Sequence, residues 1–219
     1  MRRLAALLVL VLFSAGLAQA SEEMAETKIV EDFGRQAEGS FPEGWKARHS
    51  GAEEVYRVSR QENEAFLAAR SKGEAVAIAK EFKYRLQDYP YLSWEWRVLC
   101  LPQGAEESKK ELADSAAGVY VIFEGWVSPN TLKYVWSSSL PQGQTTESPY
   151  AATTKIIVLE SGPEKKGEWV AEKVNVLEDY RRLFGQEPGQ VQAIGLMSDS
   201  DNTRSIAEAD YRRLQVSRQ

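Results

Sequence analysis

Short strand-like segments that alternate with turn residues constrain the fold of this chain most strongly. Segments such as EVYRVS (54–59), YLSWEWRV (91–98) and GVYVIF (118–123) alternate in polarity and are rich in β-branched and aromatic residues. Turn residues, as in FPEGW (41–45) and EPGQ (187–190), separate them. About eleven such segments in one chain predict an all-β fold, an antiparallel jelly-roll-like β-sandwich, rather than alternating strands and helices.

One helix interrupts this pattern, in NVLEDYRRLFGQEP (175–188). Asn175 can cap its N-terminus, and Glu178 stands three residues later, where a capping box needs an acid or amide. Gly185 suits the C-terminal stop, and Pro188 cannot continue a helix. The sequence therefore predicts a short helix over residues 176–184 that caps one end of the sandwich.

The first twenty residues have the features of a signal peptide: a basic start, an apolar run over 4–13 and the small-residue site Ala18-Gln19-Ala20. The run is too short to span a bilayer, so no stable membrane insertion is expected. We predict one domain over 21–219 that is periplasmic or secreted. Removal of residues 1–20 would change the net charge from −5 to −7, which disfavours binding to nucleic acid.

The sequence lacks the residues of the common cofactor and catalytic motifs. It contains no phosphate-binding glycine loop, dinucleotide fingerprint or nucleophile elbow. With a single histidine, His49, and a single cysteine, Cys100, it offers neither a zinc site nor a disulfide. We therefore expect no cofactor and favour a protein that is not an enzyme, although hydrolysis by a pair of carboxylates stays open.

The segment SDSDNTR (198–204) carries two aspartates one residue apart. An EF-hand is excluded because Arg204 stands where the calcium loop needs glycine, and strands flank the segment. A looser calcium site that includes Asp199 and Asp201 remains an alternative. We favour a turn before the last strand, neutralised by Arg204 and backbone N–H groups, and hence no metal.

Four large rings share strand faces, since Trp94 and Trp96 lie two residues apart, as do Tyr134 and Trp136. The favoured interpretation is that they form the core of the sandwich. The alternative is a platform on which sugar rings stack. If the rings are core, then Glu95, Arg97 and Lys133 point outward and line any groove on that side.

Several motifs recur together and in order: FPEGW, YPYLSWEWRV, AAGVYVIF, KYVWSSSLPQG, GEWVAEKVNVLEDYRRLFGQEP and AIGLMSDSDNT. In these the chain resembles an exported bacterial family known as domain of unknown function 3047, over about residues 32–216. The resemblance implies a single β-sandwich similar to jelly-roll modules that bind carbohydrate, and it brings no activity.

The family pattern that this resemblance implies differs from the chain at five positions. It has a basic residue at Glu95, an acid at Ser115, arginine at Gly118, and Gly-Asp at Arg212 and Arg213. Most of these differences change charge, so a charged site of the relatives is expected to be rewired or lost here.

We therefore predict an exported ligand-binding β-sandwich whose ligand is a carbohydrate. A glycan-active enzyme with paired carboxylates and an envelope scaffold protein are the alternatives. The candidate ligand-binding residues combine the aromatic positions with polar residues of the matching motifs; they are Trp94, Glu95, Trp96, Arg97, Asp114, Tyr134, Trp136, Asn175, Asp179, Asp201, Asn202 and Thr203.

Overall fold

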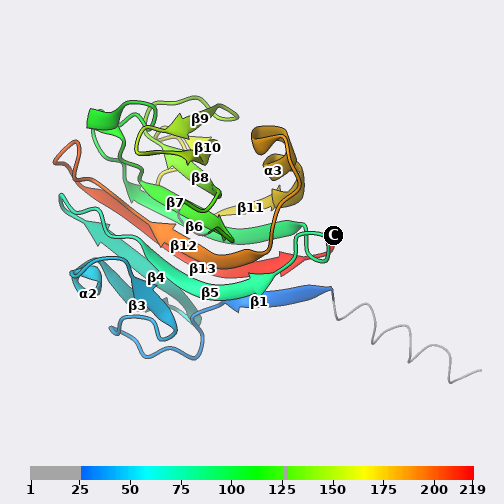
Figure 1. Ribbon diagram of the computed structural model, residues 1–219. Coiled ribbons are helices and arrows are strands. Elements are labelled where there is room, and N and C mark those ends of the chain that lie inside the picture. The colour runs from blue at the N-terminus through cyan, green and yellow to red at the C-terminus, as the bar shows by residue number, and fades with distance from the viewer. Residues whose placement is uncertain (1–25, 126–127) are drawn as a thin grey trace, which may run out of the picture.

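The computed structural model describes residues 26–125 and 128–219, and two β-sheets stack face to face over this part of the chain (Figure 1). The predicted signal peptide lies outside the described residues. One sheet has six strands: β11 (Val170–Asn175), β6 (Tyr91–Cys100), β13 (Ala207–Ser217), β4 (Glu64–Ser71) and β3 (Tyr56–Gln61) in that order, with β1 (Thr27–Glu31) also paired to β13.

The other sheet has seven strands, in the order β2 (Trp45–Ala47), β5 (Ile78–Tyr84), β12 (Val191–Met197), β7 (Ala117–Phe123), β8 (Thr131–Ser137), β10 (Ala151–Ser161) and β9 (Thr145–Ser148). Neighbouring strands run antiparallel in both sheets, apart from the parallel pair of β8 and β10. The predicted jelly-roll-like β-sandwich is confirmed.

The core between the sheets contains the four rings that the sequence singled out. Trp94 and Trp96 come from β6, while Tyr134 and Trp136 come from β8 in the opposite sheet. The ring centroids of Trp94 and Tyr134 are 5.7 Å apart, and those of Trp96 and Trp136 are 6.0 Å apart. All four side chains are buried. The core interpretation is confirmed, and the sugar-stacking platform is wrong because solvent does not reach these rings.

The predicted helix is α3 (Val176–Phe184), with the bounds that the sequence indicated. The Asn175 side chain accepts a hydrogen bond from the Glu178 backbone N–H at 3.1 Å, which satisfies one free donor of the first turn. Gly185 ends the helix in the left-handed conformation, at φ 67°. In Figure 1 the helix covers the right-hand end of the sandwich.

Two further helical turns were not predicted: α2 (Ala52–Val55) and a 3₁₀-helix (Lys110–Leu112). Both are shorter than the stretch over which a helical period can be recognised. In the part of the chain that the structure describes, no helix has the length and apolar character needed to cross a membrane.

Candidate ligand-binding groove

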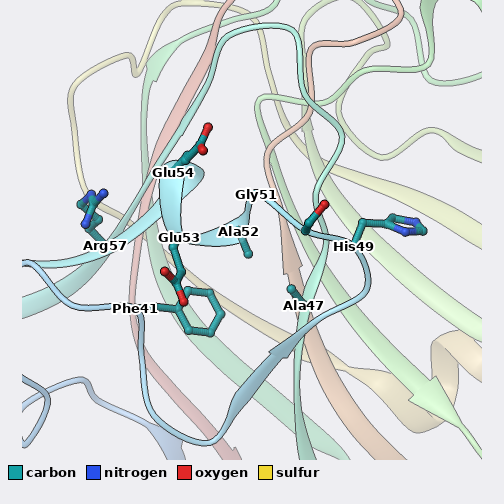
Figure 2. Close-up of a pocket in the computed structure, with 9 residues that line it drawn as sticks. Phe41, Ala47, His49, Gly51, Ala52, Glu53, Glu54 and Arg57 are labelled. Carbon is teal, nitrogen blue, oxygen red and sulfur yellow. The ribbon is translucent and has the colours of Figure 1, made fainter.

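A hollow of about 560 Å³ lies beside α2, where Phe41, His49, Glu53 and Arg57 are among its lining residues. Figure 2 shows that His49, Glu54 and Arg57 point away from one another. A binding or catalytic site needs polar groups that converge on one ligand. This hollow therefore does not have the geometry of a site, and His49 gains no catalytic partner from it.

A second hollow extends over the outer face of the seven-stranded sheet, and we call it the outer groove. It consists of two adjoining parts of about 350 and 330 Å³, which share Arg48, Tyr120 and Thr154 in their walls. One part, the apolar half, includes Ala79, Ile122, Pro129 and Gly195. The other, the acidic half, includes Glu107, Lys133, Tyr150, Asp199, Asp201 and Asn202.

Tyr120, on β7, forms the floor where the two halves of the groove meet. A side chain on Gly195, its partner on β12, would lie 3.2 Å from the Tyr120 Cβ atom and 3.3 Å from a backbone carbonyl. A side chain on Gly118 would lie 3.4 Å from the edge of the Tyr120 ring. The two glycines thus leave the space that the ring occupies on the sheet, a role that glycine often has within strands.

Three aspartates meet at the end of the acidic half. Asp114 follows the 3₁₀-helix, whereas Asp199 and Asp201 belong to the turn between β12 and β13. One carboxylate oxygen from each lies within 4.8 Å of those from the other two. We call these three residues the carboxylate cluster. Asp114 and Asp199 are buried, while Asp201 is exposed and opens the cluster to solvent.

Hydrogen bonds from neutral groups hold the turn. Asp114 accepts from the backbone N–H of Asn202 at 3.1 Å, and from the N–H and hydroxyl of Thr203 at 2.7 and 2.6 Å. Asp199 accepts from the Ser115 N–H at 2.8 Å. The predicted donors, the N–H groups of the turn itself, bind Asp114 instead, and the donor to Asp199 comes from the distant Ser115. Arg204 is not among these donors, so its predicted role as the neutralising partner is not observed.

Burial and neighbouring charges raise the pKa values of two carboxyl groups of the cluster. Burial raises the pKa of Asp199 to about 6, with a smaller upward contribution from the nearby Asp114 and Asp201 carboxylates. Lys133 and the Ser115 N–H act in the opposite direction. Burial and the Asp114 carboxylate also raise the pKa of Asp201.

Lys133 and Glu107 are two buried charges beside the cluster. The Lys133 ammonium donates to the Ser115 hydroxyl at 2.9 Å and lies 5.4 Å from the centre of the Tyr120 ring. Although burial lowers the pKa of Lys133, negative charge at Tyr120, Asp199 and Glu107 outweighs it and raises that pKa. Glu107 accepts from the Ser137 hydroxyl through Oε2 at 2.6 Å, while its Oε1 atom is buried without a partner.

Only some of the predicted site residues come together in the groove. Asp201 and Asn202 line it, and Asp114 and Thr203 hold the turn that presents them. Asn175 and Asp179 lie on or beside α3, which precedes β12, whereas the carboxylate cluster follows it. Asn175 and Asp179 therefore lie at the other end of β12 from the carboxylate cluster. Asp179 accepts a hydrogen bond there from the buried Tyr134 hydroxyl.

Glu95 and Arg97 lie on the outer face of the six-stranded sheet and not at the groove. Glu95 forms ion pairs with Arg212 and Arg213, each at 2.7 Å. Arg97 forms one with Asp210 at 2.7 Å. Because β6 and β8 belong to opposite sheets, only Lys133 of the three outward-pointing residues reaches the groove.

Sequence reasoning missed Arg48, Glu107, Tyr120 and Tyr150, which all line the acidic half. Glycine within a strand was the available signal for Tyr120, since Gly118 stands two residues before it. Glu107 lies in the long polar loop 103–115, where nothing distinguishes a buried acid from its solvated neighbours.

A family model described as "Protein of unknown function (DUF3047)" matches residues 43–215. The chain belongs to this family. The match covers most of the sequence and confirms the resemblance that the motifs indicated. A search among curated proteins finds no match.

Solved structures with a similar fold share little sequence with this chain. The K2 cleaved adhesin domain of Lys-gingipain is 8% identical, with a TM-score of 0.45, and the alignment covers 88% of this chain and 98% of that one. A family 11 carbohydrate-binding module of Clostridium thermocellum is 9% identical, with a TM-score of 0.44 and coverages of 87% and 94%. A cellulase derived from Cel12A of Rhodothermus marinus is 13% identical, with a TM-score of 0.40 and coverages of 79% and 95%.

Proposed function

We propose that this protein is an exported binding protein whose outer groove holds a carbohydrate. The observation that carries the proposal is the combination, in one groove, of an aromatic floor at Tyr120 with polar side chains at one end. Sugars present both an apolar ring face and a rim of hydroxyl groups. A ligand of that kind needs an aromatic surface and hydrogen-bonding side chains close together.

The polar side chains of the acidic half suit hydroxyl groups. Asp201 offers carboxylate oxygens, Arg48 offers guanidinium donors, and Tyr150 offers a hydroxyl next to the Asn202 amide, with 2.7 Å between them. Three carboxylates at this end disfavour polyanions such as nucleic acid. A neutral or amino-substituted sugar is therefore the ligand class that this groove fits best.

Binding to a panel of neutral and amino-sugar oligosaccharides, measured by calorimetry on the purified protein, tests the proposal. Tyr120→Ala should weaken the binding of any sugar that binds at least about tenfold, because the stacking surface is lost. Tyr91→Ala is a matched control, since Tyr91 lies on β6 in the other sheet and contacts Lys173. Absence of binding across the panel, or equal affinities for the two variants, would refute the proposal.

A glycan-active enzyme is the second candidate, and the pKa of Asp199 favours it. A carboxyl group with a pKa near 6 can serve as a general acid close to neutral pH, and Asp201 stands beside it. Release of new reducing ends from the same oligosaccharides would support an enzyme, provided that Asp201→Asn abolishes it. Binding without release would leave the binding protein as the function.

The scaffold alternative gains no support from the surface. Among the described residues, the large apolar side chains that are exposed are Ile29, Tyr150 and Ile206, which come from three separate segments. Tyr150 lies against the turn that precedes Ile206, but three such side chains are fewer than the large apolar patch of a protein-docking surface requires.

Export to the periplasm or beyond is part of the proposal, and it rests on the sequence of residues 1–20. The intact mass of the protein recovered from the envelope or culture fluid tests whether export removes residues 1–20. A mass that corresponds to a chain starting at Ser21 is expected. Retention of Met1 would contradict export by cleavage.

A further inference from the structure

The carboxylate cluster places more negative charge in the protein than the chain itself neutralises. Asp114 is fully buried and Asp199 is 5% exposed, and both lie within ion-sharing distance of Asp201. Carboxylates this close repel one another unless a cation or a proton compensates them. Hydrogen bonds to Asp114 and Asp199 come from backbone N–H groups and one hydroxyl, which carry no charge.

Lys133 is the buried cation that faces this region, and it serves two acids, while Arg48 lines the same half of the groove from an exposed position. The charge of Lys133 acts on both Asp199 and Glu107, and its ammonium group donates to Ser115 rather than to any carboxylate of the cluster. Of the ion pairs among the described residues, none includes Asp114, Asp199 or Asp201. Lys133 and the exposed Arg48 therefore stand against four acidic side chains, and neither forms an ion pair with the cluster.

Glu107 provides an independent observation in the same cavity. Its side chain is 0% exposed, and it lines the acidic half together with Asp199 and Asp201. Its Oε1 atom has no hydrogen-bond partner in the part of the chain that the structure describes. A buried acceptor without a donor is costly, and this oxygen is therefore open to a donor or cation from outside the chain.

We propose that the acidic half of the groove binds a calcium ion through Asp114, Asp199 and Asp201. Oxygen ligands without nitrogen or sulfur suit calcium or magnesium rather than zinc. Calcium takes six to eight oxygens at about 2.4 Å, so oxygens that share one ion lie within about 5 Å of each other. The spread of 4.8 Å in the cluster matches this requirement. The exposed Asp201 side leaves room for water to complete the coordination.

Magnesium fits the cluster less well than calcium. It requires near-octahedral geometry at about 2.1 Å and usually keeps several waters. Asp114 is fixed by hydrogen bonds from the turn, and Asp199 by one from Ser115, so these two carboxylates cannot contract freely around a smaller ion. The inference does not depend on a sugar ligand, because it concerns the metal alone.

Calcium titration of the purified, chelator-treated protein tests the proposal by calorimetry and by melting temperature. Extracellular calcium sites have Kd values of about 0.1–1 mM, so saturating calcium should raise the melting temperature by roughly 4 °C. Asp201→Asn should weaken calcium binding at least about tenfold, because it removes one charged ligand. Asp88→Asn, an exposed aspartate elsewhere, should bind calcium like the parent protein.

If the calorimetric titration gives no heat of calcium binding and the melting temperature does not change, the proposal is overturned. Lys133 would then be the counter-ion of the cluster. An equal response to magnesium would overturn the choice of ion. A full calcium response in Asp201→Asn would overturn the location. If that variant does not fold, Asp201→Glu retains the charge while displacing the oxygen, and a calcium affinity equal to that of the parent would again contradict the site.

Discussion

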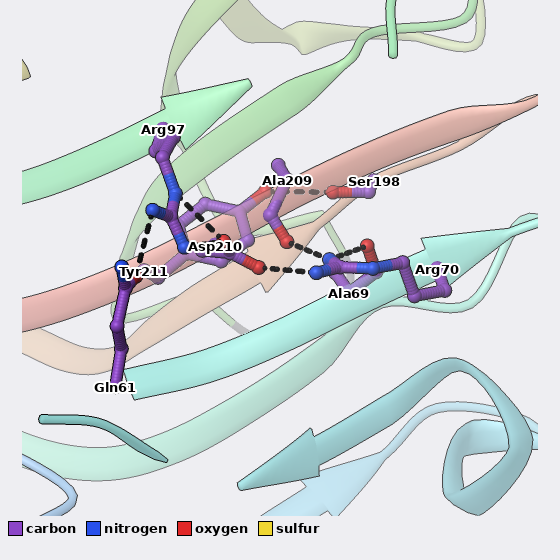
Figure 3. Close-up of polar contacts among 8 residues, drawn as sticks. All are labelled: Gln61, Ala69, Arg70, Arg97, Ser198, Ala209, Asp210 and Tyr211. Carbon is purple, nitrogen blue, oxygen red and sulfur yellow. Dashed lines mark hydrogen bonds and ion pairs between the residues drawn. The ribbon is translucent and has the colours of Figure 1, made fainter. Parts of the chain in front are cut away.

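The two outer faces of the sandwich treat buried acidic side chains in opposite ways. On the six-stranded sheet, Asp210 is fully buried and lies between Arg97 and Arg70, with N–O distances of 2.7 and 2.8 Å (Figure 3). On the seven-stranded sheet, Asp114 and Asp199 are also buried, but their hydrogen-bond donors are uncharged. The first face pairs its buried acid with two cations, whereas no described ion pair includes the buried acids of the second face.

This difference separates a buried acid that stabilises the fold from buried acids that are available to a ligand. A buried acid between two arginines stabilises the strands that carry them, here β4, β6 and β13. The Arg97 guanidinium also lies 4.6 Å from the Trp169 ring, which holds it in place. The carboxylates of the cluster also hold a turn through hydrogen bonds, but their mutual repulsion opposes that stabilisation as long as no cation or proton compensates it.

Substitution of Asp210 by Asn should have the largest effect and should sharpen the comparison. It leaves Arg70 and Arg97 without their anionic partner, and the free energy of unfolding should fall by about 3 kcal/mol. Denaturant unfolding with and without calcium measures it, and the loss should be the same in both conditions. Glu81→Gln, at an exposed position on β5, should leave stability unchanged. A loss that depends on calcium would mean that the two faces are not independent.

Substitution of Asp114 by Ala should have the next largest effect. The variant removes the acceptor of three hydrogen bonds from Asn202 and Thr203, so unfolding free energy should fall by about 2 kcal/mol even without calcium. Asp114→Asn keeps one acceptor oxygen and should lose less. Thermal unfolding of chelator-treated protein compares them. Equal stability of Asp114→Ala and the parent would show that the turn does not need this residue.

The sequence predicted the local features of the fold well. α3 was located with its bounds because its cap, its stop and its helical residues lie within a single stretch of chain. Alternation also assigned the rings of β6 and β8 to the core. The pairing of strands was beyond such reasoning, and so was the parallel pair β8 and β10, because neither depends on neighbours in the sequence.

The candidate site was predicted only in part, for the same reason. Asp201 and Asn202 were found because SDSDNTR is conspicuous by itself. Asp114 joins them from 89 residues away from Thr203, and only the fold brings the two segments together. The only mark of Tyr120 in the sequence is a strand glycine two residues before it, and nothing separates Glu107 from the other acids of its loop.

The departures from the family pattern fall into two groups in space. Three of the positions at which the expected family pattern differs come together, because Glu95 forms ion pairs with Arg212 and Arg213. Ser115 accepts from Lys133, and a side chain on Gly118 would lie 3.2 Å from the Lys133 Cε atom.

Glu172, on the edge strand β11, lies on the inner side of the six-stranded sheet, because it is the cross-strand partner of Trp94. Burial, together with the Glu160 carboxylate, raises its pKa to about 7, although it accepts a hydrogen bond from the Trp96 indole. The folded state therefore holds a proton that the unfolded state releases above pH about 4.5. Stability should fall as pH rises from about 4.5 to about 7.

Glu172→Gln should remove that dependence. Because Glu172 is partly exposed, the expected gain in unfolding free energy at alkaline pH is about 1 kcal/mol, with little difference from the parent at acid pH. Denaturant unfolding at a series of pH values measures it. A difference between the two proteins that stays constant across this range would contradict the raised pKa.

Substitution of Asn175 by Ala should have the smallest effect, and it calibrates the comparison. The cap of α3 lies at the opposite end of the sandwich from the carboxylate cluster, since β12 separates them. Loss of the hydrogen bond to the Glu178 N–H should lower stability by about 1 kcal/mol, whereas Asn175→Asp retains an acceptor and should preserve it. The rise in melting temperature on adding calcium should be the same in both variants and in the parent, because neither changes a residue of the cluster.

An unchanged melting temperature in Asn175→Ala would reject the cap. A reduced calcium response would instead show that the end of the sandwich carrying α3 is coupled to the end carrying the acids, and the contrast between the two outer faces would then no longer be local.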